Sequence, residues 1–237
     1  GEWILAEKSA DYYYGLSSKT FTLVRLERNR VVESIEIAEM KTAGIYEDIV
    51  NQAIYEAMFK NKYDGCYQRP EYTIVEFYVK GSTHNCFWVK HSDVYKNLYT
   101  PDDPEVRTAN SQIIKWIKKN NVEIPKVALV SNHAYFSRLA TGKWYLMSYG
   151  IDPILLGASE NNFISEESSE YNKNNIMNYP EHKKIMEKWI SISAQRHIEF
   201  EDSIGAKEKH SLDLENYYPE ETSYDENSTN NFLNQLQ

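Results

Sequence analysis

Glu39 and Lys41 are the charged residues of this chain whose types and spacing are best suited to chemistry. Side chains alternate along a strand, so in ESIEIAEMK both residues fall on the row that also carries Ile35 and Ile37. Charges on such a hydrophobic row are costly unless they bind something. A carboxylate there can hold Mg²⁺ or Mn²⁺, and the neighbouring ammonium can contact an attacking water or stabilise charge that develops on a phosphate.

A metal site of this kind requires a second carboxylate from another strand. Asp11, in the segment SADYYYG one hairpin upstream, is the candidate. The main-chain carbonyl of Met40 is a candidate to complete the metal's ligand shell. The expected centre therefore consists of Asp11, Glu39 and Met40 around one or two divalent ions, with Lys41 positioning or activating the water.

The segments around these residues predict the elements that must position them. FTLVRL (21–26) and VVESIEIAEMK (31–41) are typical of strands, and ERNR between them predicts a turn, so together they predict a long hairpin. After Gly44, the apolar spacing of IYEDIVNQAIYEAMFKNK predicts a helix. Further strands are predicted at 72–81, 86–90, 126–131 and 143–150, and further helices at 106–121 and 176–200.

This order of elements predicts an α/β protein with a mixed β-sheet flanked by helices. The opening hairpin must be antiparallel, and the later crossovers favour parallel pairing. The expected organisation is an α/β core at 1–156, a surface loop at 157–175, a C-terminal helix at 176–200 that begins near Pro180, and a flexible acidic tail at 201–237.

Residues 7–90 resemble the PD-(D/E)XK nuclease superfamily. The pattern is an acid one hairpin before a strand that ends in Glu-x-Lys, followed by a helix that carries Gln. Asp11 matches the first acid, EMK matches Glu-x-Lys, and Gln52 with Tyr55 is similar to the helix motif of the RecB-like branch. The resemblance implies a restriction-endonuclease-like core and Mg²⁺- or Mn²⁺-dependent hydrolysis of phosphodiester bonds, by an endonuclease or exonuclease acting on DNA rather than RNA. It also implies catalytic roles for Asp11, Glu39, Lys41 and Gln52, with Gln52 orienting substrate or a metal-bound water.

Other residues are weaker candidates for substrate contact. Glu7 is the candidate for an acid that the superfamily often carries on a helix before the first strand. His133 follows a predicted buried strand, where α/β proteins often form their sites. Basic side chains on the second helix are candidate phosphate contacts, namely Lys115, Lys118 and Lys119.

Two other interpretations remain open. Glu39 and Lys41 can form a simple ion pair on an exposed strand face. The chain can also be a module without catalysis that binds nucleic acid or a protein partner, as an inhibitor or immunity protein does. Metal binding that disappears in Asp11→Ala would favour the nuclease, whereas indifference to metal would favour the interaction module.

Composition bounds these hypotheses. The 237 residues carry a net charge of −9, of which the acidic segment 198–237 contributes −8, so the remainder is close to neutral and compatible with nucleic acid. The tail is a candidate contact for a protein partner. No apolar run is long enough for a membrane helix, which predicts a soluble, intracellular (cytoplasmic) protein. Cys66 and Cys86 are expected to be a reduced pair, with a bridge between them left open.

Overall fold

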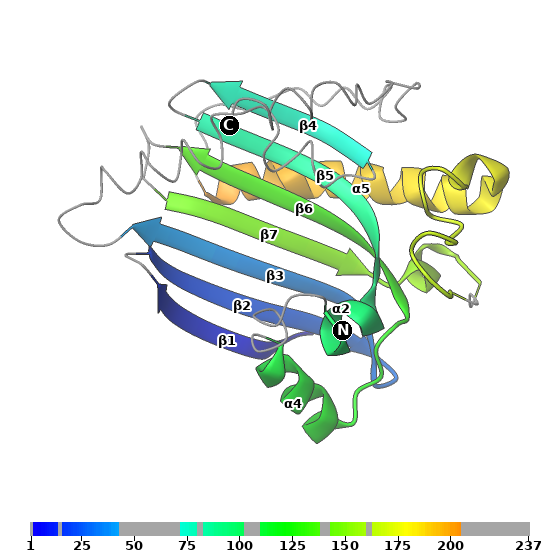
Figure 1. The fold of residues 1–237 in the computed structure, drawn as a ribbon, viewed down its shortest axis with the longest axis horizontal. Helices are drawn as coiled ribbons and strands as arrows, with labels where there is room; N and C mark the ends of the chain where they lie inside the picture. The colour runs from blue at the N-terminus through cyan, green and yellow to red at the C-terminus, as the bar shows by residue number, and fades with distance from the viewer. Residues whose placement is uncertain are drawn as a thin grey trace, which may run out of the picture.

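Seven strands form one sheet in the computed structural model of the chain, which describes residues 2–13, 16–42, 72–79, 83–101, 110–137, 143–159 and 163–204 (Figure 1). The strand order is β1-β2-β3-β7-β6-β5-β4. The strands are β1 (Trp3–Tyr13), β2 (Leu16–Glu27), β3 (Arg30–Thr42), β4 (Tyr72–Val79), β5 (Thr83–Asp93), β6 (Val127–Ser137) and β7 (Lys143–Ile151).

The helices of the described residues differ greatly in length. They are α2 (Val94–Tyr99), α4 (Ser111–Asn120), the 3₁₀ turns η1 (Pro153–Leu156) and η2 (Ile176–Asn178), and α5 (Pro180–Ser203). Pro180 is the first residue of α5, as predicted, because a proline at this position loses no helical hydrogen bond. None of these helices combines the length and the apolar composition needed to cross a membrane.

The hairpin predicted from the sequence is confirmed. Glu27 pairs with Arg30, and the two residues between them, Arg28 and Asn29, have φ angles of 49° and 67°. Two consecutive positive φ angles produce the type of turn whose twist matches the flanking strands. The strands predicted downstream also form, with bounds that extend the predicted ones at β5, β6 and β7.

The predicted parallel pairing is wrong. Every neighbouring pair of described strands is antiparallel. Asp93 at the end of β5 pairs with Val127 at the start of β6, so the connection that contains α2 and α4 leaves and re-enters the sheet at the same end. Such a connection joins antiparallel neighbours, whereas a parallel pair requires a crossover from one end of the sheet to the other.

The main hydrophobic core lies between the sheet and α5, on the side that we call the α5 face (Figure 1). Trp189, Ile190 and Met186 of α5 are fully buried against sheet residues such as Phe87 and Leu129. The predicted C-terminal helix is therefore part of the same core as the strands. Ile185 and Ile192, predicted to share the stripe of Trp189, are only partly buried at its margin.

Two expectations about individual residues are corrected. The segment 157–175 was expected to be a surface loop, yet Phe163 and Tyr171 are buried in the core beneath α5. Cys86 was expected to be a reduced thiol and is disulfide-bonded. The predicted helix that follows Gly44, with Gln52 and Tyr55, lies outside the described residues, as does the tail from residue 205 onward.

Candidate functional site: a cavity between the sheet and helices α2 and α4

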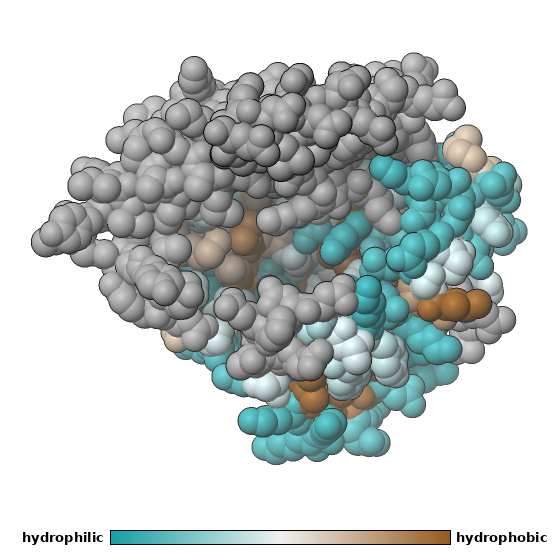
Figure 2. All heavy atoms as spheres, in the orientation of Figure 1, coloured by the Kyte–Doolittle hydropathy of each residue, from teal (hydrophilic) through white to brown (hydrophobic). Residues whose placement is uncertain are grey.

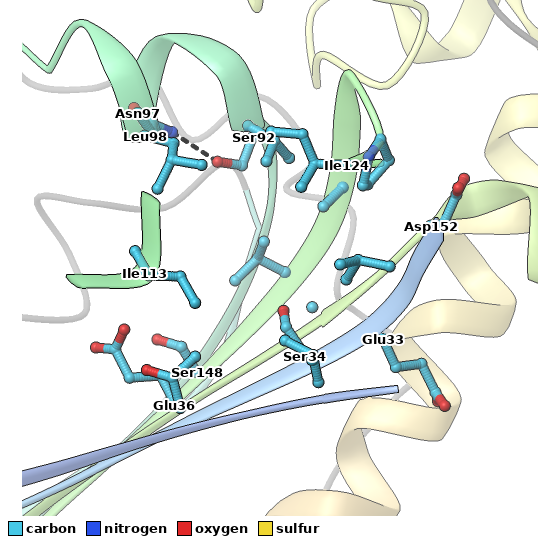
Figure 3. Close-up of a pocket in the computed structure, with 18 of the residues that line it drawn as sticks. Glu33, Ser34, Glu36, Ser92, Asn97, Leu98, Ile113, Ile124, Ser148 and Asp152 are labelled. Atoms are coloured by element: carbon cyan, nitrogen blue, oxygen red, sulfur yellow. Dashed lines mark hydrogen bonds between the residues drawn. The ribbon is translucent and has the colours of Figure 1, made fainter. Parts of the chain in front are cut away.

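A cavity of about 310 Å³ lies on the opposite side of the sheet from α5, on what we call the cavity face. Helices α2 and α4 cover it near one end of the strands (Figures 1 and 3). In the space-filling view, apolar side chains are visible between hydrophilic ones on this side of the molecule (Figure 2). The cavity is therefore a hollow with both apolar and polar walls.

The alternation of side chains along β3 sets the floor of the cavity. Ser34 and Glu36 pair with Gly150 and Ser148 of β7, and all four positions fall on the cavity face. Figure 3 shows Glu36 beside Ser148, with Glu33 on the opposite side of the strand. The period of two in ESIE thus separates the polar floor from the core on the α5 face.

Gly150 keeps the middle of this floor open. A Cβ atom at this position would lie 2.7 Å from the Ser34 hydroxyl oxygen and 3.9 Å from a methyl carbon of Val130. The first distance is shorter than a normal contact. Any larger residue at position 150 would therefore displace the Ser34 side chain and occupy part of the cavity.

The roof and walls of the cavity are largely apolar. Helix α4 contributes Ile113, Trp116 and Ile117, which lie one helical turn apart on one stripe. The sheet and the connections around it contribute further apolar side chains: Val24, Val31, Val32, Val94, Leu98, Ile124, Pro125, Ala128, Val130 and Ile151. These side chains offer a ligand apolar surface that is shielded from water.

Side-chain hydrogen bonds to the main chain hold α2 and the start of α4 together at the rim. The Asn110 amide donates to the carbonyl oxygens of Asn97, at 2.8 Å, and Leu98, at 3.1 Å. The Asn97 amide in turn donates to the Ser92 hydroxyl at 2.7 Å (Figure 3). The covering helices are thereby fixed to each other and to the end of β5.

A polar row crosses the floor over five neighbouring strands. Glu7, Thr22, Glu36, Ser148 and Asn132 occupy successive paired positions on β1, β2, β3, β7 and β6. The Ser148 hydroxyl donates to Asn132 Oδ1 at 2.7 Å. The Asn132 amide nitrogen is buried and has no hydrogen-bond partner in the part of the chain that the structure describes.

Four carboxylates line the cavity, and two of them are neutralised from outside it. Glu33 points to the α5 face, where Arg25 lies 2.6 Å away and the Tyr149 hydroxyl donates to it. The Tyr149 pKa rises to about 12, chiefly through burial and secondarily through this bond. Asp152 accepts from Arg30 at 2.8 Å. Glu36 lies on the cavity face of β3.

Enclosure by protein atoms raises the pKa of Glu36. Its side chain remains accessible to solvent, so the group is reachable from the cavity. No Lys, Arg or His of the described residues offsets this effect. Glu36 is therefore a partly desolvated carboxylate that a cation would stabilise.

The predicted metal centre is not brought together. Glu39 is paired with Lys19 on β2 and Tyr145 on β7, in a row of the α5 face. Asp11 on β1 pairs with Ser18 on β2, and Ser18 pairs with Met40 on β3. Asp11 therefore belongs to the row of Met40, which is adjacent to the row of Glu39. Because consecutive rows lie on opposite faces, this register does not place Asp11 and Glu39 around one ion.

Lysines gather around Glu39 instead. Lys8, Lys19 and Lys41, which we call the lysine patch, are exposed on the α5 face of β1, β2 and β3, away from α5 itself. The Lys8 ammonium lies 5.5 Å from the centre of the Phe21 ring. Glu39 therefore stands opposite Lys19 and two positions from Lys41 on the same face, as the ion-pair interpretation expects.

The remaining predicted residues are distributed over the fold. Glu7 lines the cavity, although it was predicted as a substitute for a helix-borne acid. His133 is completely buried and does not contact a substrate at the surface, which corrects that prediction. Exposed positions on α4 hold the three predicted phosphate contacts: Lys115, Lys118 and Lys119.

His133 belongs to a buried polar chain that the sequence did not reveal. Its Nε2 lies 3.0 Å from the Ser131 hydroxyl and its Nδ1 lies 3.1 Å from His197 Nδ1. His197 Nε2 is 3.6 Å from Glu201, which also accepts from the Asn85 amide. These residues are separated by up to 116 positions, so no local pattern could have indicated their contact.

No group of three or more His, Cys, Asp or Glu among the described residues is arranged to hold a metal ion. Comparison with protein-family models, with curated proteins and with solved structures finds no match.

Proposed function

We propose that this protein binds a small organic molecule in the cavity between the sheet and helices α2 and α4. The observation that supports the proposal is a hollow of about 310 Å³ with an apolar roof and a few convergent polar groups on its floor. Binding sites for small molecules typically start at about 300 Å³ and have this division between apolar walls and orienting polar groups.

The two kinds of wall would contribute differently to binding. Apolar surface of a ligand buried against Ile113, Trp116 and Val32 contributes about 25 cal/mol per Å². Ser34, Ser148 and Glu36 would fix the orientation of the ligand through hydrogen bonds. The fold itself, with α2 and α4 held at the rim by Asn97 and Asn110, supplies a preformed site.

A thermal-shift screen with small organic molecules tests the proposal. Ligands that bind the folded state raise its melting temperature. We expect Ile113→Trp, which fills the cavity from α4, to abolish this effect, and Lys115→Trp, which adds the same side chain on the exposed side of α4, to retain it. Equal responses from the two variants would locate binding outside the cavity and reject the proposal.

Nucleic-acid contact through the lysine patch is a second candidate, with or without metal-dependent cleavage in a restriction-endonuclease-like core. Exposed Lys19 and Lys41, together with the cation–ring contact of Lys8 and Phe21, favour it. Calorimetric titration with Mn²⁺ and cleavage assays on DNA and RNA, with wild type and Glu39→Ala, test the catalytic form. Salt-dependent binding of a single-stranded oligonucleotide, lost in Lys19→Glu and Lys41→Glu, tests the non-catalytic form.

A further inference from the structure

The charges that line the cavity are all of one sign. The acidic lining residues are Glu7, Glu33, Glu36 and Asp152, and no Lys, Arg or His occurs among the described lining residues. Arg25 and Arg30 neutralise Glu33 and Asp152 from outside the cavity. The carboxylate charge that a ligand would meet on the cavity floor is therefore that of Glu36 on β3.

Glu36 is the carboxylate most directly offered to a ligand. It lies on the floor beside Ser148 and faces the side of the cavity below Ile113 of α4 (Figure 3). Partial desolvation disfavours its charged form, and a cation bound next to it would recover the lost stabilisation. An anionic or uncharged polar group at this position would gain no such stabilisation.

The neighbouring hydroxyls suit a donor with several hydrogens. The Ser148 hydroxyl gives its hydrogen to Asn132 Oδ1, which leaves its oxygen lone pairs to accept. Ser34, two positions before Glu36 on β3, supplies another hydroxyl oxygen on the same face. An ammonium group carries three N–H donors and no acceptor, so it matches a site composed of a carboxylate and hydroxyl oxygens.

A metal ion matches the cavity less well than an organic cation. Mg²⁺ and Ca²⁺ require six or more oxygen ligands, and no group of three or more acidic, His or Cys side chains is assembled among the described residues. The apolar roof formed by Ile113, Trp116 and Leu98 would also be left uncovered by a bare ion.

We infer that the ligand of this cavity is an organic amine with an apolar body, whose ammonium group is bound by Glu36 and whose body packs beneath α4. This inference rests on the proposed function. It adds the class of ligand and names the residue that selects it.

The experiment compares three probes of equal chain length: hexylamine, hexanol and hexanoate. Binding to the full chain is measured by calorimetry for the wild type, Glu36→Gln, and Glu27→Gln, an exposed carboxylate at the end of β2. We expect the wild type and Glu27→Gln to prefer hexylamine over hexanol. The preference should be about tenfold or more, because a hydrogen bond to a charged group is stronger than one between neutral groups. Glu36→Gln should lose this preference and still bind hexanol.

The outcomes separate the inference from the proposed function. If hexanol or hexanoate binds the wild type as tightly as hexylamine, or if Glu36→Gln binds hexylamine unchanged, the amine inference is overturned while cavity binding stands. If no probe binds, the proposed function and the inference both fail. Urea unfolding of Glu36→Gln is the folding control, and we expect its stability to be at least that of the wild type because the desolvated charge is removed.

Discussion

Acidification below about pH 6.5 is expected to destabilise the fold through the buried chain of Ser131, His133, His197 and Glu201. Each ring nitrogen of His133 has one partner in this chain, His197 Nδ1 at 3.1 Å and the Ser131 hydroxyl at 3.0 Å. The Ser131 hydroxyl also donates to the Tyr149 carbonyl oxygen at 3.5 Å, and His197 Nε2 lies 3.6 Å from the Glu201 carboxylate. A further proton on His133 would face the Ser131 oxygen or the His197 ring in place of a counter-charge.

The surroundings of the two rings offer little to stabilise added charge. Phe87 stacks on both rings, with ring centres 5.0 Å from His133 and 5.2 Å from His197, and Phe200 closes the same cluster. Glu201 is the acidic group of the chain, and it lies beyond His197. Burial, followed by the charge of His197, therefore holds the pKa of His133 well below 6.5.

The sign and size of the effect follow from proton linkage. In the unfolded chain His133 titrates near pH 6.5, whereas in the folded protein it stays neutral to much lower pH. Below about pH 6.5 the unfolded state thus binds more protons, so the free energy of unfolding decreases as the pH falls. For one histidine the loss between about pH 7.5 and about pH 5 is about 2 kcal/mol, and above pH 7.5 this group contributes no further change.

Urea unfolding monitored by tryptophan fluorescence at a series of pH values measures this loss. The difference between the wild type and His133→Phe reports on His133 together with its partner His197, because phenylalanine cannot bond to the His197 ring. His182→Phe, at the half-buried start of α5, controls for the same substitution at a histidine outside the buried chain. Identical slopes for the wild type and His133→Phe between about pH 7.5 and about pH 5 would refute the assignment of a neutral, buried His133.

Three further changes test the fold. Trp189→Ala removes a completely buried ring beneath the sheet and should cost about 3–5 kcal/mol in urea unfolding; a loss below about 1 kcal/mol would contradict its place in the core. Asn121 ends α4 with φ 50°, so Asn121→Gly should be nearly neutral in thermal melts while Asn121→Ala lowers stability by about 1 kcal/mol; equal melts would count against this conformation. Arg30→Met leaves buried Asp152 without its ion-pair partner and should destabilise more than Arg30→Met in an Asp152→Asn background, as a double-mutant cycle measures; additivity would disprove the coupling.

Local structure could be predicted from the sequence because its causes are local. β-branched and aromatic residues with a polar break at ERNR determine the β2–β3 hairpin, and an apolar stripe with Pro180 at its start determines α5. The direction of β6 relative to β5 could not be predicted in this way. It depends on the end of the sheet to which the chain returns after α2 and α4, and no property of those segments states it.

The candidate site was mislocated by a single row. The sequence showed that Glu39 and Lys41 share a face, which the structure confirms, but it could not show that Asp11 aligns with Met40. Pairing register depends on contacts across two strands, and a shift of one residue exchanges the faces. The sequence ESIEIAEM shows that Glu36 alternates with Ile35 and Ile37 and so faces the other side of the strand. It does not show that α4 covers this side, which is what makes Glu36 part of a cavity floor and not of a solvated surface.

The register of β3 is itself determined by a buried polar contact. Glu33 meets Arg25 across the β2–β3 pair and accepts from the Tyr149 hydroxyl on β7. A slip of one residue would move Glu33 to the opposite face of the sheet and leave the buried Tyr149 hydroxyl without its acceptor, which is disfavoured. The same slip would exchange the faces of Glu36 and Ile37, so the contact on one side of the sheet determines which side chains form the cavity floor on the other.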